Sequence, residues 1–369
     1  MTDVVVVGGG IMGLLSAREL LASGCSVLLI DQQQCGREAS WAGGGIISPL
    51  YPWRYNDAIT ALASWAQDCY PNLVQQLEDE TGVISELNQC GLYMLDSREK
   101  EDALVWAKRF NRAVEAIPVN QLYLKEPALA NEFNDVLWMP YIGNVRNPRL
   151  LEALKRSLHL NPNCRIIEGQ SVQKVIVSEG RAWGVATESQ EWIADSVLVT
   201  AGAWTSTIQG TSQLDFPIEP VKGQMLVFEP QPDLIQSMLM KDGRYLLPRK
   251  DGRIVVGSTL EFTGFEKEVT EEGKQALLDS AFNMVPALQR AKIEKHWAGL
   301  RPGSPGGMPF IGAVGEIERL FVNAGHFRNG LVLAPASCRL VVDLMLGREP
   351  LINPAPFSPS RKREVMEMI

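Results

Sequence analysis

The stretch VVVVGGGIMG near the N-terminus most constrains the fold of this chain. Four β-branched residues, Val4–Val7, lead into glycines spaced as Gly8-x-Gly10-x-x-Gly13, and the following LLSARELLASG places apolar residues at helical spacing. A second apolar run, CSVLLID, ends on Asp31, about 20 residues after the turn. The glycine spacing alone would also suit an ordinary tight turn, but strand, turn, helix and acid-terminated strand together predict a dinucleotide-binding βαβ unit.

Each part of this unit has a physical role. Glycine lets the backbone approach a pyrophosphate, and the helix N-terminus offers unpaired N–H groups and the positive end of its dipole to phosphate charge. A carboxylate at Asp31 can accept a hydrogen bond from a ribose hydroxyl. It argues against a 2′-phosphate, hence against NADPH, but does not separate NAD from FAD. We expect cofactor contacts from Gly8, Gly10, Ile11, Met12, Gly13, Asp31 and Gln32.

Composition narrows the class of protein. The 369 residues are 46% apolar, enough for a large core and two domains. With 35 basic and 43 acidic residues the net charge is −8, which disfavours nucleic acid and anionic membranes as partners. Neither a signal peptide nor a membrane span fits the sequence, so we expect a cytoplasmic protein. The six cysteines lack metal-ligand spacing, so we expect no metal site and reduced thiols, mostly in the core.

Two later regions extend the nucleotide-binding pattern. The segment GREASWAGGGIISP, residues 36–49, is rich in small residues that would let a second loop lie close to a cofactor. The segment SVQKVIVSEGRAWGVATES predicts a hairpin with its turn near Glu179-Gly180, and a buried strand follows at residues 196–200. In isolation these pieces are only strands of a mixed sheet.

Taken in order, the segments resemble the flavoprotein amine oxidoreductases of the D-amino acid oxidase and sarcosine oxidase superfamily, and most closely its glycine oxidases. The resemblance runs nearly from end to end. The stretches that carry it are VVGGGIMG, GREASWAGGG, VKGQMLVF, RYLLPRKDGRIVVGST, WAGLRPGSPGGMPFIG and GHFRNGLVLAP. The last four are much more specific than the first.

The resemblance implies an α/β fold in the broad sense, and more specifically an α+β protein of two domains. A Rossmann-like FAD-binding domain would be discontinuous, and a substrate-binding domain, mostly an antiparallel sheet, would be inserted into it twice. The FAD-binding domain is expected at residues 1–80, 145–215 and 298–369, and the substrate-binding domain at residues 81–144 and 216–297.

The resemblance also implies FAD rather than NAD. We expect it to be non-covalent, because the first 158 residues contain no histidine and no cysteine lies between Arg301 and Gly325, where relatives attach flavin through sulfur. Backbone contacts to adenine are implied for Val172, and Thr200-Ala201-Gly202 would close the flavin domain. Further implied FAD contacts are Ala39, Ser40, Gly43, Gly44, Gly45 and Gly202.

The stretch NAGHFRNGLVLAP places His326 and Arg328 at a strand-to-helix junction, where doubly wound folds bind ligands. By resemblance, this helix N-terminus faces the pyrimidine edge of the flavin, and its N–H groups and dipole raise the electron affinity of the ring. His326 and Arg328 could add charge or hydrogen bonds there, or Arg328 could only brace the loop. The implied FAD contacts are His326, Phe327, Arg328, Asn329, Gly330, Leu331 and Val332.

Pro335 complicates this helix. Proline has no N–H, so the Leu331 carbonyl needs another partner if the helix starts at Gly330. Either another donor reaches that carbonyl, or the helix starts later than Gly330.

Three residues are expected on the substrate side. A two-residue hairpin at Asp251-Gly252 would put Tyr245 and Leu247 on one face of the sheet, with the tyrosine hydroxyl either satisfied in the core or pointing at a ligand. Arg301 follows an apolar strand, and no acid lies within ten positions after it. Its partner is either an acid from elsewhere in the fold or, as the resemblance implies, the carboxylate of the substrate. The resemblance also brings Arg328 to the substrate side and makes Tyr245, Arg301 and Arg328 the catalytic residues.

The implied activity is oxidative deamination of glycine and other small amines or D-amino acids, with O2 as acceptor. The products would be an α-keto acid such as glyoxylate, ammonia or an amine, and H2O2, in support of thiamine thiazole synthesis. How far sarcosine, D-alanine or D-proline compete with glycine stays open. We also expect a homo-oligomer, a tetramer or a dimer.

Other functions remain open at this point. A D-amino-acid dehydrogenase would pass the electrons to a quinone or carrier instead of O2. A flavin domain acting in tRNA modification is disfavoured by the acidic composition, and a non-catalytic flavin-holding subunit is disfavoured by the presence of both Tyr245 and Arg301.

Overall fold

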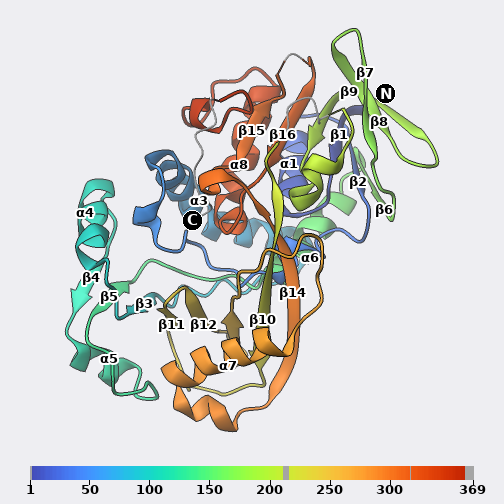
Figure 1. The fold of residues 1–369 in the computed structure, drawn as a ribbon. Helices are drawn as coiled ribbons and strands as arrows, with labels where there is room; N and C mark the ends of the chain where they lie inside the picture. The colour runs from blue at the N-terminus through green and yellow to red at the C-terminus, as the bar shows by residue number, and fades with distance from the viewer. Residues whose placement is uncertain (1, 211–215, 316, 362–369) are drawn as a thin grey trace.

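The computed structural model describes residues 2–210, 216–315 and 317–361, and its strands form two eight-stranded sheets (Figure 1). In the first sheet, β1 lies between two parallel neighbours, and Val4–Val7 are buried. A strand covered on both faces explains the run of valines in the sequence. Six of its strands follow the order β15 (Phe310–Ala313), β16 (Leu320–Ala324), β9 (Glu191–Val199), β1 (Thr2–Val7), β2 (Val27–Asp31) and β6 (Cys164–Glu168). The other two, β7 and β8, form a hairpin that joins the sheet through the pairing of β8 with β9.

Helices cover one face of this sheet and a hairpin covers the other. Val4 and Val6 face the helices, and Val5 and Val7 face the hairpin side. The hairpin turns at Glu179 and Gly180, as predicted, with φ of 51° and 74°. The helices are α1 (Ile11–Ala22), α3 (Asp57–Thr81), α6 (Asn147–His159) and α8 (Gly330–Met345), and the hairpin is β7 (Lys174–Ser178) with β8 (Arg181–Ala186).

The second sheet is antiparallel except where β11 runs parallel to β3. Helix α7 (Glu271–Met284) covers one face, and its first turn is capped by Thr270, whose side chain accepts a hydrogen bond from Gly273 N–H. Helix α4 (Lys100–Phe110) packs on the other face, and α5 (Val119–Lys125) contributes Leu122 to the core under α7. The order is β14 (Ile293–Gly303), β10 (Glu219–Phe228), β13 (Ile254–Gly257), β12 (Arg244–Pro248), β11 (Met238–Lys241), β3 (Leu92–Leu95), β5 (Val136–Met139) and β4 (Glu115–Ile117).

The predicted fold class is confirmed: a Rossmann-like layer and a largely antiparallel sheet alternate along the chain. The first sheet draws its strands from residues 2–31, 164–199 and 310–324, and the second from residues 92–139 and 219–303. Strand β14 crosses residue 298, where a domain boundary was expected. Parts of the expected FAD-binding segments, residues 211–215 and 362–369, lie outside the described residues.

Two local expectations were wrong, on a hairpin and on the cysteines, and the alternative left open for the last helix is decided. The hairpin after β12 does not turn on two residues, because Arg249 N–H bonds to Arg253 and the loop of three residues between them ends in Gly252 at φ 82°. Helix α8 does begin at Gly330: the Tyr70 hydroxyl donates to the Leu331 carbonyl at 2.5 Å and replaces the missing proline N–H. All six cysteines are free, but only two, Cys35 and Cys338, are buried.

Candidate active site

A cavity of about 1630 Å³, part of it open to solvent, lies where the two sheets meet. The carboxyl ends of β1, β2, β9 and β16 form one side, and residues of β12 and β14 form the other. Its lining runs from the glycine turn after β1 to Arg301 on β14, so one continuous cavity joins the nucleotide-binding edge of the first sheet to the second sheet.

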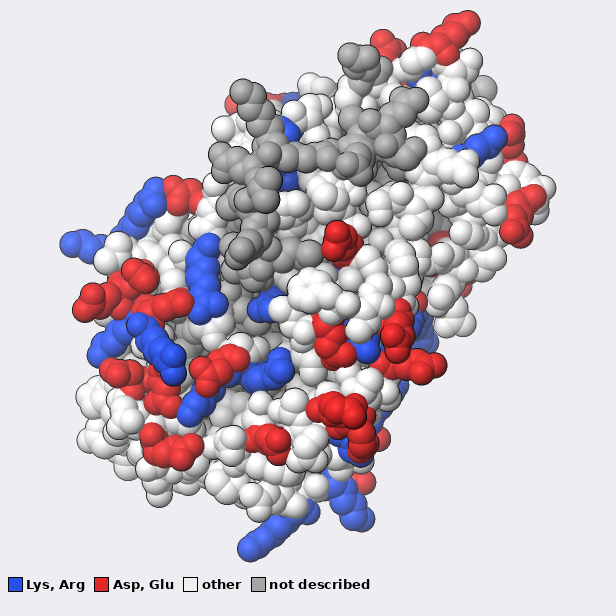
Figure 2. All heavy atoms as spheres, in the orientation of Figure 1, with Lys and Arg blue, Asp and Glu red and all other residues white. Residues whose placement is uncertain are grey.

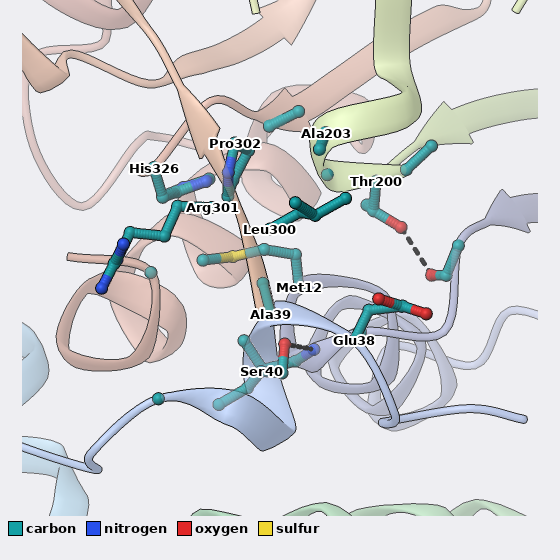
Figure 3. A pocket seen from close by; sticks show the side chains of 18 of the residues that line it. Met12, Glu38, Ala39, Ser40, Thr200, Ala203, Leu300, Arg301, Pro302 and His326 are labelled. Carbon is teal, nitrogen blue, oxygen red and sulfur yellow. Dashed lines mark hydrogen bonds between the residues drawn. The ribbon is translucent and has the colours of Figure 1, made fainter. Parts of the chain in front are cut away.

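The glycine turn after β1 lines the cavity as a cradle, next to Met12 and Ser40, which Figure 3 labels. Gly8 has φ 102°, and a Cβ there would lie 2.6 Å from the Thr200 carbonyl oxygen. A Cβ at Gly10 would instead point into the cavity, with Ser40 Oγ at 3.2 Å as its close neighbour in the described chain. The backbone is thus exposed where a phosphate needs to approach it.

The N-terminus of α1 closes this cradle. Gly10 caps the helix without a side-chain hydrogen bond, and Ile11 N–H donates to Ser40 Oγ at 3.0 Å. Asp31 lines the cavity, and its carboxylate accepts from the N–H groups of Gly9 and Gln33 at 2.6 and 2.8 Å. Burial raises the pKa of Asp31. Each carboxylate oxygen of Asp31 keeps a lone pair for a hydroxyl, so the glycine cradle, the N-terminus of α1 and this acid fit the pyrophosphate and ribose of FAD.

The second small-residue loop lies against the tyrosine strand. A Cβ at Gly44 would lie 2.7 Å from Leu247 and 2.9 Å from the Tyr245 ring, so Tyr245 and Leu247 share one face of the sheet as predicted. Arg249 fixes this loop: it donates to the carbonyl oxygens of Gly44 and Val145 at 2.7 and 2.9 Å. Burial lowers the pKa of Arg249 to about 10.

The basic loop before α8 carries less charge than the sequence indicates. His326 is 2% exposed and shares a hydrogen bond of 3.1 Å with Ser337. Burial lowers the pKa of His326 to about 3, so the ring is neutral near pH 7 and, of the two expected contributions, can supply hydrogen bonds but not charge. Arg328 lies with its guanidinium 5.4 Å from the centroid of the Phe327 ring and remains the cation of this loop that faces the cavity.

Arg301 lies on the substrate side of the cavity, beside Leu300 and Pro302 (Figure 3). Its guanidinium donates to Ser258 Oγ at 2.6 Å and to two backbone carbonyls, and among the described residues it forms no ion pair with a carboxylate. Burial lowers the pKa of Arg301 to about 10, and the positive charge of Arg328 acts in the same direction. A buried cation without a carboxylate is suited to bind an anionic ligand.

Tyr245 is 6% exposed and lines the same part of the cavity. Its hydroxyl donates to Met225 Sδ at 3.3 Å, a weak acceptor. A ligand oxygen would therefore compete well for this hydroxyl.

Most of the residues expected from the sequence lie around this cavity, and three do not. Gly13, Asn329 and Val332 are outside its lining. Gly13 packs instead against the turn, since a Cβ there would lie 1.8 Å from the Gly8 carbonyl oxygen. The expected residues that do line it are Gly8, Gly10, Ile11, Met12, Asp31, Gln32, Ala39, Ser40, Gly43, Gly44, Gly45, Val172, Gly202, Tyr245, Arg301, His326, Phe327, Arg328, Gly330 and Leu331.

The sequence analysis missed two residues that also line the cavity, Glu38 and Trp204. Glu38 lines the cavity and pairs with Lys267 at 2.9 Å, and Trp204 packs on Phe265 with centroids 5.5 Å apart. The segment between β13 and α7 therefore reaches across to the first sheet. No local pattern in the sequence could indicate a contact over 229 positions.

Within the described ranges, no helix is long and apolar enough to cross a membrane. The same residues contain no group of three or more histidines, cysteines or acids able to hold a metal ion.

Comparison with known proteins places the chain in a family. It matches the DAO family, described as FAD dependent oxidoreductase, over residues 3–344. A glycine oxidase of Pseudomonas aeruginosa is 48% identical over 97% of this chain and 98% of that protein. The bifunctional protein ThiO/ThiG of Synechocystis sp. is 32% identical over 98% of this chain and 54% of its own length. The crystal structure of glycine oxidase from Geobacillus kaustophilus has a TM-score of 0.93 and 27% identity, over 98% of this chain and 99% of that one. The chain belongs to the FAD-dependent oxidoreductase family.

Proposed function

We propose that this protein is an FAD-dependent amine oxidase that deaminates glycine and other small amines or D-amino acids, such as sarcosine, D-alanine and D-proline. The products are an α-keto acid such as glyoxylate, ammonia or an amine, and H2O2. The observation that carries the proposal is Arg301, a buried cation at the cavity wall without an ion-pair partner among the described residues. The name of the ThiO/ThiG relative supports a role in supplying thiazole synthesis.

The cofactor would be held by the chain in three places. The Gly10 cradle and the start of α1 would bind the pyrophosphate, Asp31 the ribose, and the backbone at the start of α8 the flavin ring. Bound FAD would supply the acceptor for the two electrons taken from the amine. We propose that residues 1–80, 145–215 and 298–369 act as the FAD-binding domain and the remainder as the substrate-binding domain.

The side chains on the substrate side bind and orient. Arg301 would hold the substrate carboxylate through a pair of N–H groups, and Tyr245 would donate its hydroxyl to the same group. Positioning then replaces acid–base chemistry, which suits a site whose buried histidine, His326, is neutral. The interspersed basic and acidic side chains on the face in Figure 2 lend no support to a nucleic-acid substrate.

The decisive experiment is peroxide release from a panel of small amino acids, glycine first. Turnover of glycine with one H2O2 per imine released supports the oxidase. If glycine reduces the flavin without air but reoxidation by O2 in stopped flow is slow, the protein is a dehydrogenase instead. Reduction by no amino acid of the panel contradicts the proposal.

FAD is expected to be non-covalent. Acid precipitation should leave a colourless pellet and a yellow supernatant, because the tethers used by relatives are missing from the corresponding segments of this chain. A yellow pellet after washing would contradict this expectation.

Arg328→Ala is expected to bind FAD but to make it harder to reduce. The guanidinium lies beside the start of α8, where positive charge stabilises the negative charge that reduction brings. The expected loss is about 1.5 to 3 kcal/mol, the range for a hydrogen bond to a charged group, measured as a lower midpoint potential and weaker sulfite binding. An unchanged potential with unchanged kinetics would leave Arg328 as a brace for the loop.

We also propose that the protein is cytoplasmic and forms a dimer or a tetramer. Light scattering of the purified holoenzyme tests the assembly, and a monomer would contradict it.

A further inference from the structure

The segment between β13 and α7 reaches the first sheet through an ion pair and a ring contact. Lys267 Nζ lies 2.9 and 3.0 Å from the two carboxylate oxygens of Glu38. The Phe265 ring packs on Trp204 of the short helix η2 (Gly202–Thr207), with ring centroids 5.5 Å apart and ring planes at 34°. Glu38 and Trp204 both line the cavity, so both contacts are made at the cavity wall.

The two contacts lie on opposite sides of the glycine turn. Strand β1 lies between β9 and β2, and Trp204 follows β9 whereas Glu38 follows β2. On the Glu38 side, Ser40 Oγ accepts from the first N–H group of α1 at 3.0 Å. On the Trp204 side, the Thr200 hydroxyl donates to the Gly8 carbonyl at 2.7 Å. A segment bound on both sides therefore passes across the turn that would hold the pyrophosphate.

The ends of this segment are fixed on β10, whereas its middle is exposed. Glu261 and Lys222 exchange two backbone hydrogen bonds, at 2.9 and 3.0 Å, and Lys222 Nζ donates to the Glu268 carbonyl at 3.2 Å. Between these ends, the Phe262 side chain is 62% exposed and that of Phe265 is 46% exposed. A stretch with so little buried apolar surface opens at a low cost in free energy, while its fixed ends stay in place.

We propose that residues 262–267 form a latch across the cofactor cradle, and that Lys267 and Phe265 keep this latch closed and so retain non-covalent FAD. The side chains of Lys267 and Glu38 are 41% and 20% exposed, so their ion pair is weak and is screened by salt. FAD can therefore enter and leave when the latch opens, without unfolding of either sheet. The inference rests on the FAD site of the proposed function and not on the choice of substrate.

The test measures how fast the holoenzyme exchanges its bound FAD for an excess of radiolabelled FAD. Lys267→Met removes the charge, and we expect exchange about 2- to 5-fold faster, the range for losing an exposed ion pair. Phe265→Ala should speed exchange about 2- to 10-fold, the range for losing an aromatic pair. The matched controls are Lys274→Met, which breaks an exposed ion pair of 2.7 Å with Glu271, and Phe262→Ala in the latch itself. Both controls should exchange FAD at the wild-type rate.

Salt and a covalent crosslink separate a latch from a purely structural contact. Higher ionic strength should speed exchange more in the wild type than in Lys267→Met, because the variant lacks the ion pair that salt screens. A carbodiimide joins an amine and a carboxylate that are in contact, by an amide bond with loss of water. Wild-type holoenzyme in which mass spectrometry finds Lys267 joined to Glu38 should exchange FAD more slowly than the untreated protein. Treated Lys267→Met should not slow.

The outcomes are distinguishable. Wild-type exchange rates in both Lys267→Met and Phe265→Ala overturn the latch, and so does a crosslinked protein that exchanges FAD as fast as before. Lower thermal midpoints of the variant apoproteins, with an acceleration that salt does not reduce, would make the contacts purely structural and also overturn it. Normal FAD content in Gly10→Val overturns the proposed FAD site and this inference together. Exchange as expected in a protein that does not oxidise glycine supports the latch and contradicts the proposed activity alone.

Discussion

Arg301→Leu is expected to bind glycine about 30-fold to several thousand-fold more weakly, because truncating one member of a buried charge pair costs about 2 to 5 kcal/mol. The arginine has no internal carboxylate partner among the described residues, so the lost pair is the one with the substrate. The activity of the variant toward amines without a carboxylate, if they react, should fall far less. Arg301→Lys should restore activity only partly, since lysine keeps the charge but lacks the planar pair of donors.

The measurement compares turnover of glycine with that of ethylamine, alongside FAD content and thermal midpoint. Arg109→Leu, which removes an exposed arginine paired with Asp57, serves as the control for loss of an arginine elsewhere. Normal FAD content, with a loss of activity confined to carboxylate substrates, supports Arg301 as the residue that binds the substrate carboxylate. A uniform loss for all amines, with depleted FAD, would show that Arg301 holds the fold together instead.

Gly10→Val is expected to yield protein without flavin. The Cβ of residue 10 would enter the cavity beside Ser40 Oγ, and the two further carbons of valine would fill the space left for the pyrophosphate. The ratio of flavin to protein absorbance in the purified variant should fall to the level of wild-type apoprotein.

The comparison with wild-type apoprotein matters because bound cofactor stabilises only the folded state. The variant should therefore have the thermal midpoint of the apoprotein and not that of the holoenzyme, and added FAD should not raise this midpoint. Normal flavin content in Gly10→Val would show that the N-terminal turn does not bind the cofactor.

The features that could be predicted from the sequence are those decided by nearby residues. The βαβ unit is complete within residues 2–31, and the β7–β8 hairpin is decided by Glu179 and Gly180, so their patterns were sufficient. The resemblance supplied the two-sheet arrangement, which no local pattern contains. Neutral His326 was missed because its charge depends on burial against α8, and burial is a property of the folded chain.

Contacts between distant segments account for the other errors. The start of α8 depends on a hydroxyl from Tyr70, 261 positions before Leu331, and the loop at Gly44 depends on Arg249, 205 positions after it. Neither residue carries a signal in its own neighbourhood. The proline at residue 335 indicated the missing donor, but residues 330–335 alone could not decide between a later helix start and a donor supplied by tertiary structure.

The interleaving of the two sheets along the chain has a consequence for biosynthesis. Strand β1 leaves the ribosome with β2 close behind it, but its other neighbour, β9, ends at Val199, and β9 in turn pairs with β16, which ends at Ala324. The second sheet is completed only with β14, at Gly303. Neither sheet can therefore close until most of the chain has been made, and β1 lacks its second neighbouring strand until β9 has been synthesised, which leaves an apolar strand edge unpaired during that time.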